Sequence, residues 1–115
     1  MRKLIIFALS AAALSTPAMA SDRTGYQAIV AGDYRAAEEK LVAERRIFPS
    51  RPELMINLAT VYARTGRVTE AASLYRAALV AEDVELAMPN DMVASSRTVA
   101  QRGLDRLGGT ALATR

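Results

Sequence analysis

The sequence predicts an all-α fold, a short superhelix of two helical hairpins followed by a C-terminal helix that caps them. Three observations support this prediction. Small residues recur after 34 positions, at Gly32 and Gly66 and again at Ala37 and Ala71. Apolar residues on both sides of Gly66 recur at spacings of three and four, which marks one face of a helix. The chain has no cysteine, so the fold depends on apolar packing without disulfide bonds.

The first 20 residues have the layout of a secretory signal peptide. A short positive start precedes an apolar run of 11 residues (LIIFALSAAAL), and Ala18 and Ala20 form the small-x-small pattern of a cleavage site. The alternative is a membrane anchor, but a span needs about 20 apolar residues, and this run ends at Ser15. We expect cleavage near Ala20, a periplasmic or secreted chain, and no stable membrane insertion afterwards.

Cleavage also changes the charge of the chain. Losing Arg2 and Lys3 turns 15 basic and 12 acidic residues into 13 and 12, a net charge of +1. A nearly neutral chain has no general attraction to nucleic acid or anionic lipid, so we expect no nucleic-acid partner. Removing 20 residues from 115 leaves 95, a length typical of one domain.

The first hairpin is predicted over residues 21–49. Its first helix is short, from about Asp22 to Ala31, and Gly32 and Asp33 form the turn. The second helix starts at Tyr34 and ends at Pro49, because proline rarely follows a residue in helical conformation.

The second hairpin is predicted over residues 52–85, with helices at 52–65 and 68–81. Ser50 and Glu53 have the spacing of a capping box, and Pro52 is tolerated in a first helical turn. Gly66 is predicted to end the first helix in a left-handed conformation. A turn this short makes the two helices antiparallel neighbours.

The rest of the chain departs from the repeat. Residues 86–94 are predicted to form a loop or a weak β-hairpin around Pro89. Residues 95–107 are predicted to form the capping helix, with Ser95 or Ser96 as its N-cap. We expect Gly108 and Gly109 to end this helix and residues 108–115 to form a flexible tail. Gly103 within the helix indicates either close packing or fraying.

The second hairpin resembles a tetratricopeptide repeat, whose pattern is W-x2-L-G-x2-Y, then A-x3-F, then P. Residues 52–85 supply Met55, Leu58, Ala59, Tyr62, Ala71 and Tyr75 at these spacings, with Asp83 in place of the proline. Residues 18–51 match less completely, through Gly25, Ala37, Leu41 and Pro49. The positions that the resemblance assigns to repeat packing are Gly32, Ala37, Leu41, Leu58, Ala59, Tyr62, Gly66, Ala71, Tyr75 and Ala78.

The resemblance implies binding of a protein or peptide, because the first helices of such hairpins line a concave groove. Leu58, Val61 and Tyr62 should face the neighbouring helix, so the opposite side of 52–65 should face the groove. The resemblance also implies that Asn57 hydrogen-bonds a peptide backbone, whereas a merely solvated asparagine is the alternative. The candidate groove residues are Arg23, Tyr26, Glu53, Ile56, Asn57, Thr60 and Arg64.

The residues for catalysis are scarce. The chain has no histidine and no cysteine, so the commonest general base and the soft metal ligands are missing. Lys40, the only lysine after residue 20, has Glu39 and Glu44 as helix neighbours, which fits a solvated helix face. The acidic residues near Glu82 lack the spacing of a calcium loop. We therefore predict no enzyme activity, no cofactor and no metal site.

Two functional hypotheses remain. The first is an exported, non-catalytic adaptor or scaffold that binds a partner segment in the groove. The alternative is a structural subunit that completes its core by forming a homo-oligomer or by docking onto a larger envelope complex, because repeat arrays usually need three or more repeats.

Overall fold

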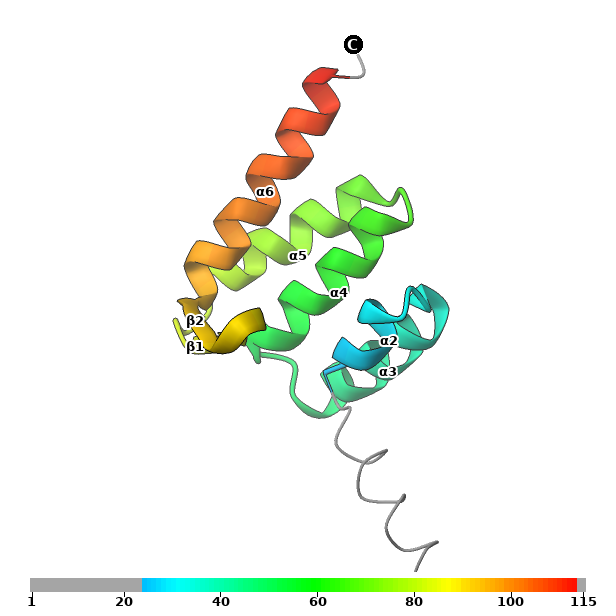
Figure 1. Ribbon diagram of the computed structural model, residues 1–115, viewed down its shortest axis with the longest axis vertical. Helices are drawn as coiled ribbons and strands as arrows, with labels where there is room; N and C mark the ends of the chain where they lie inside the picture. The colour runs from blue at the N-terminus through cyan, green and yellow to red at the C-terminus, as the bar shows by residue number, and fades with distance from the viewer. Residues whose placement is uncertain (1–23, 114–115) are drawn as a thin grey trace, which may run out of the picture.

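Five α-helices and one small sheet form the chain over residues 24–113, the part that the computed structural model describes (Figure 1). The predicted signal peptide and Arg23 lie outside the described residues. The all-α prediction is confirmed, with a two-stranded sheet added to it. The elements in chain order are α2 (Tyr26–Val30), α3 (Tyr34–Ile47), α4 (Pro52–Arg64), α5 (Val68–Val80), β1 (Glu85–Met88), the 3-10 turn η1 (Pro89–Asp91), β2 (Met92–Ser95) and α6 (Ser96–Ala113).

The two predicted hairpins form as α2–α3 and α4–α5. Each turns at a glycine in left-handed conformation, Gly32 with φ 80° and Gly66 with φ 82°. The Asp33 side chain accepts a hydrogen bond from Ala36 N at 3.2 Å and so caps α3. Helix α2 begins only at Tyr26, because Gly25 before it is also left-handed, with φ 70°.

The predicted capping box at the start of α4 is not present. The N-cap of α4 is Arg51, one residue after Ser50, and no side chain caps it. Pro52 is the first helical residue, where its missing N–H costs nothing. The Arg51 guanidinium instead stacks on the Phe48 ring at 4.0 Å.

Helix α4 lies at the centre of the molecule and contributes to both apolar clusters (Figure 1). One cluster joins it to the first hairpin and contains Ala37, Leu41, Leu54, Leu58 and Val61. The other joins it to α5, β1 and α6 and contains Met55, Ile56, Ala59, Ala71, Tyr75, Ala78, Leu86 and Ala100. The apolar positions predicted for repeat packing are thus buried, except Tyr62, which is half-buried and contacts both clusters.

A charged pair joins the two hairpins. Arg67 at the start of α5 donates from Nη2 to Glu38 Oε1 at 2.6 Å and from Nη1 to Glu38 Oε2 at 3.1 Å. The guanidinium also lies 4.4 Å from the centre of the Tyr62 ring. The hydrogen bonds from Arg67 hold the pKa of the Glu38 carboxyl below its ordinary value.

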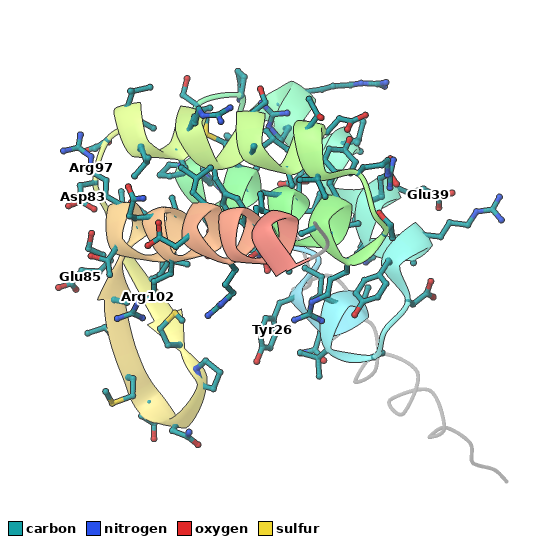
Figure 2. All side chains as sticks on the ribbon, turned by 90° about the horizontal axis from the view of Figure 1, so that it is seen from above. Tyr26, Glu39, Asp83, Glu85, Arg97 and Arg102 are labelled. Carbon is teal, nitrogen blue, oxygen red and sulfur yellow. The ribbon has the colours of Figure 1, made fainter. Side chains whose placement is uncertain are left out.

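Residues 85–95 form a β-hairpin, the second of the two conformations predicted for this segment. Strands β1 and β2 are antiparallel, with Leu86 opposite Ala94 and Ala87 opposite Val93. The turn between them contains Asn90 in left-handed conformation, with φ 66°. The hairpin projects from the helical body on the side where Tyr26 lies (Figure 2).

Asp83 organises the start of α6. Its Oδ1 accepts hydrogen bonds from Ser95 Oγ at 2.6 Å, Ser96 Oγ at 3.2 Å and Arg97 N at 3.3 Å. Ser95 Oγ in turn accepts from Thr98 N at 3.3 Å, which confirms Ser95 as the cap. These donors stabilise the ionised form, and the pKa of Asp83 is lowered, chiefly by the Ser95 hydroxyl. Figure 2 shows Asp83 beside Arg97.

The predicted end of the last helix is wrong. Helix α6 runs to Ala113, past Gly108 and Gly109. A glycine ends a helix efficiently when it adopts a positive φ, and neither Gly108 nor Gly109 does so. Of the two readings of Gly103, close packing is the one found, because the residue lies against the Tyr75 ring.

Candidate binding groove

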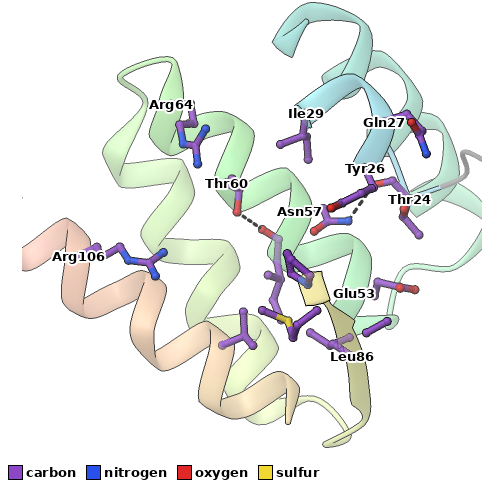
Figure 3. Close-up of a pocket in the computed structure, with 15 residues that line it drawn as sticks. Thr24, Tyr26, Gln27, Ile29, Glu53, Asn57, Thr60, Arg64, Leu86 and Arg106 are labelled. Carbon is purple, nitrogen blue, oxygen red and sulfur yellow. Dashed lines mark hydrogen bonds between the residues drawn. The ribbon is translucent and has the colours of Figure 1, made fainter. Parts of the chain in front are cut away.

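A groove of about 720 Å³ lies between α2 on one side and the β-hairpin with α6 on the other. Helix α4 forms its floor, α2 forms one wall, and β1 with α6 forms the other (Figure 3). The first helices of the two helical hairpins, α2 and α4, therefore line this groove together with β1 of the β-hairpin and α6. We refer to this space as the groove.

The floor of the groove is one face of α4. Glu53, Ile56, Asn57, Thr60 and Arg64 line it, at spacings of three and four that place side chains in one row. Ile56 is 4% exposed and joins the apolar core below the groove. The groove therefore has an apolar base with polar groups along it.

Asn57 connects the floor to the chain segment before α2. Its Nδ2 donates a hydrogen bond to the Thr24 carbonyl oxygen at 2.9 Å, and Figure 3 shows the two residues together. Thr24 itself lines the groove. The asparagine amide thus binds a main-chain carbonyl of its own chain, and a hydrogen bond from it to the backbone of a partner stays a prediction.

Thr60 and Tyr75 form a hydrogen-bonded chain beneath the groove. Thr60 Oγ1 donates to the Ile56 carbonyl at 3.0 Å and lies 3.2 Å from the Tyr75 hydroxyl. A hydroxyl has one proton to donate, so Tyr75 is the donor to Thr60. The Tyr75 side chain is 5% exposed, and this bond satisfies its polar end.

The charged residues of the groove separate along its length. Figure 3 shows Arg64 and Arg106 at one end and Glu53 at the other. Arg64 Nη1 donates to the Tyr34 hydroxyl at 2.8 Å, whereas no hydrogen bond or ion pair holds Arg106 to another described residue. The arginine end of the groove therefore has donors suited to a carboxylate.

The structure brings together six of the seven residues predicted for the groove. Tyr26, Glu53, Ile56, Asn57, Thr60 and Arg64 all line it, and Arg23 lies outside the described residues. Their role in binding stays a prediction. Tyr26 is 48% exposed, so this side chain of the α2 wall is open to a ligand.

The opposite wall of the groove was not predicted from the sequence. Leu86, Ala87, Met88 and Pro89 from the hairpin, and Val99 and Arg106 from α6, line the groove as well. On the α2 side, Thr24, Gln27 and Ile29 were not predicted either. The apolar stripe of the last helix could have predicted the opposite wall. A helix that packs beside α5 occupies the position of the first helix of a third repeat.

Glu53 is the only acidic residue among the described residues that line the groove. Within the part of the chain that the structure describes, no three His, Cys, Asp or Glu side chains gather in a group able to hold a metal ion. The carboxyl groups with a lowered pKa, Glu38 and Asp83, do not line the groove. Among the helices of residues 24–113, none has both the length and the apolar character needed to cross a bilayer.

Comparison with known families supports the repeat pattern. A family model described as "Tetratricopeptide repeat" matches residues 23–84. Comparison with curated proteins found no match. Comparison with solved structures found none either.

Proposed function

The chain belongs to the tetratricopeptide repeat family, and on that premise we propose that it is an adaptor that binds a segment of a partner protein in the groove. Repeats of this family typically mediate protein–protein interaction and not catalysis. The observation that carries the proposal is the groove itself, where α2, α4 and α6 meet around an apolar base with polar groups along it.

The charges of the groove indicate what kind of segment it takes. Two of its three charged lining residues are Arg64 and Arg106, at one end, and the third is Glu53. A segment with an acidic side chain facing the arginines would make charge-assisted hydrogen bonds. Apolar side chains next to it would contact the partly buried Met88 and Val99.

A pair of variants in one helix tests this function. Arg106→Glu reverses a charge that lines the groove, whereas Arg102→Glu makes the same change at an exposed position of α6 outside it. We expect crosslinking in living cells, followed by mass spectrometry, to recover less partner with Arg106→Glu and an unchanged amount with Arg102→Glu. Circular dichroism should show equal helicity. Equal recovery of partner by both variants would contradict binding in the groove.

Self-assembly is the second candidate function. Met92 and Val93 on β2 are each 63% exposed, and an exposed apolar strand is a site for association with another copy. Sedimentation over a range of concentrations separates the two functions. A monomer at all concentrations favours the adaptor, and a stable dimer favours self-assembly.

Export is a further part of the proposal. It rests on the signal-peptide pattern of residues 1–20. Cell fractionation and the intact mass of the purified chain test it. A mature chain that begins at Ser21 in the periplasm or medium supports export, and a full-length chain retained in the cytoplasm contradicts it.

A further inference from the structure

Strand β1 presents its edge to the groove. Three consecutive residues of β1, Leu86, Ala87 and Met88, line the groove together with Pro89 of η1, and no residue of β2 lines it. Successive side chains of a strand point to opposite faces, so a strand that met the groove with one face would contribute every second residue. An unbroken run means that the groove runs along the backbone of β1, on the side away from β2.

The hydrogen-bond register shows which backbone groups this edge offers. Ser96 N donates to the Val84 carbonyl at 2.7 Å, and Val84 N donates to the Ser96 side-chain Oγ at 3.0 Å, so Val84 and Ser96 occupy a hydrogen-bonded position of the ladder. Such pairs alternate with non-bonded pairs along antiparallel strands. Ala87 and Val93, three positions further along the hairpin, are opposite each other and therefore form a non-bonded pair. The N–H and C=O of Ala87 point away from β2, as do those of Glu85.

We propose that the groove holds an extended segment of a partner protein that pairs with β1 as a third strand. This inference rests on the proposed function and adds the way in which the segment is bound. Main-chain hydrogen bonds to Glu85 and Ala87 supply affinity that does not depend on sequence. Pro89 has no N–H, so the pairing ends at Met88. The edge is four residues long, which is about 13 Å at about 3.3 Å per residue.

The chemistry of the groove specifies the segment. Beside the paired backbone, Met88 and Val99 are partly buried and accept an apolar side chain. Arg64 and Arg106 line the end of the groove away from Glu53, and their positive charge selects a segment with an acidic residue beyond its paired part. The outer edge of β2 lacks these features, because β2 does not line the groove.

Two proline variants form a matched test. Ala87 and Val93 face each other across the hairpin, and neither N–H is used between the strands. Ala87→Pro therefore removes a donor from the edge in the groove, and Val93→Pro removes one from the outer edge, without breaking a bond of the hairpin. The probe is a peptide of about eight residues selected from a random displayed library on the chain purified from cells. Fluorescence polarisation then measures its Kd.

We expect Ala87→Pro to weaken peptide binding by up to about tenfold, as expected for the loss of one hydrogen bond, and Val93→Pro to leave the Kd unchanged. Hydrogen exchange should show that the peptide protects the Ala87 amide and not the Val93 amide. In the peptide, methylation of backbone nitrogens should weaken binding at every second position, which tests the pairing even if Ala87→Pro fails to fold.

The other outcomes separate this inference from the proposed function. If both proline variants and all methylated peptides bind equally well while Arg106→Glu weakens binding, the groove binds through side chains alone and the third strand is refuted. If Arg106→Glu also has no effect, or no peptide is selected, the proposed function fails as well. If Ala87→Pro instead dissociates a dimer of the chain, the occupant is a second copy and the inference is overturned.

Discussion

Gly103 lies directly against the ring of Tyr75, and a Cβ atom placed on Gly103 would be 2.3 Å from Tyr75 Cζ. Tyr75 belongs to α5 and Gly103 to α6, so the missing side chain lets the two helices approach. The Tyr75 hydroxyl reaches on to Thr60 of α4. One aromatic side chain thus contacts α4, α5 and α6, and two of these helices, α4 and α6, line the groove.

Gly103→Ala should destabilise the protein. Alanine favours a helix over glycine by about 1 kcal/mol, but overpacking against a buried ring costs about 1–3 kcal/mol, and the Tyr75 ring has little room to move at 5% exposure. We expect a net loss of up to about 2 kcal/mol in the free energy of unfolding, because the overpacking cost is opposed by the helix preference. Urea unfolding measures it.

Gly108→Ala is the matched control. Gly108 lies in the same helix, and a Cβ placed on it would meet nothing within 4 Å. This variant should stabilise the protein by up to about 1 kcal/mol. If the two alanine variants have the same stability, the contact between Gly103 and Tyr75 has no energetic importance.

The sequence was sufficient to predict the hairpins because their signals are local. The spacing from Leu54 to Tyr62 predicts the packing face of α4, although Ile56 on the opposite side is buried as well, and a left-handed glycine ends that helix. The end of α6 was not predictable in this way. A pair of glycines such as Gly108 and Gly109 is typical of a helix C-terminus. A glycine ends a helix when it adopts a positive φ, and neither residue does so.

The stability of the folded protein should depend on pH through Asp83. Its pKa in the folded protein lies below the ordinary 3.8, chiefly because the Ser95 hydroxyl donates to it. The stabilisation is complete above the ordinary pKa and is lost as the pH falls through the lower folded value. Asp83→Asn should therefore remove part of the loss of stability seen in acid. Thermal unfolding of both proteins between neutral pH and pH values below 3.8 checks this.

An unchanged acid profile in Asp83→Asn would mean that other carboxyl groups account for the acid sensitivity. Glu38 is the other candidate, since Arg67 lowers its pKa below the ordinary 4.5. Glu38→Gln is the corresponding variant. Because Glu38 and Asp83 lie at different places in the fold, their effects should add.

The groove was predictable on one side only. Helical spacing places Asn57 and Arg64 on the face of α4 opposite its core, and both line the groove. Arg106 was missed because its position depends on where α6 packs. The 34-residue register places the next repeat at Leu86, but β1 begins at Glu85 and α6 only at Ser96. The β-hairpin separates α6 from the end of the second repeat, and no local sequence pattern shows where α6 packs after this insertion.

Truncation after Glu85 should show whether α6 caps the repeats. Removing α6 takes away Gly103 and Ala100, which cover the Tyr75 side chain and its cluster. Exposing one large apolar side chain costs about 1.5–3 kcal/mol, and small domains have only about 5–15 kcal/mol of stability in total. We expect a lower melting temperature and lower solubility. A truncated chain that melts and dissolves like the full chain would refute the capping role.

Asn57→Ala should loosen α2 specifically. The Asn57 amide holds the Thr24 carbonyl at 2.9 Å, just before α2, and α2 itself has no fully buried residue. Losing one hydrogen bond costs about 1 kcal/mol, which is a large share of the local stability of a five-residue helix. Native-state hydrogen exchange should therefore become faster at the α2 amides, for example at Ile29 N, which donates to the Gly25 carbonyl. Exchange in α5 should stay unchanged.

Arg64→Ala is the control for Asn57→Ala, because it removes only the bond to Tyr34 on α3. If exchange at α2 is the same in both variants, Asn57 does not hold this segment, and its amide is instead available to a partner in the groove.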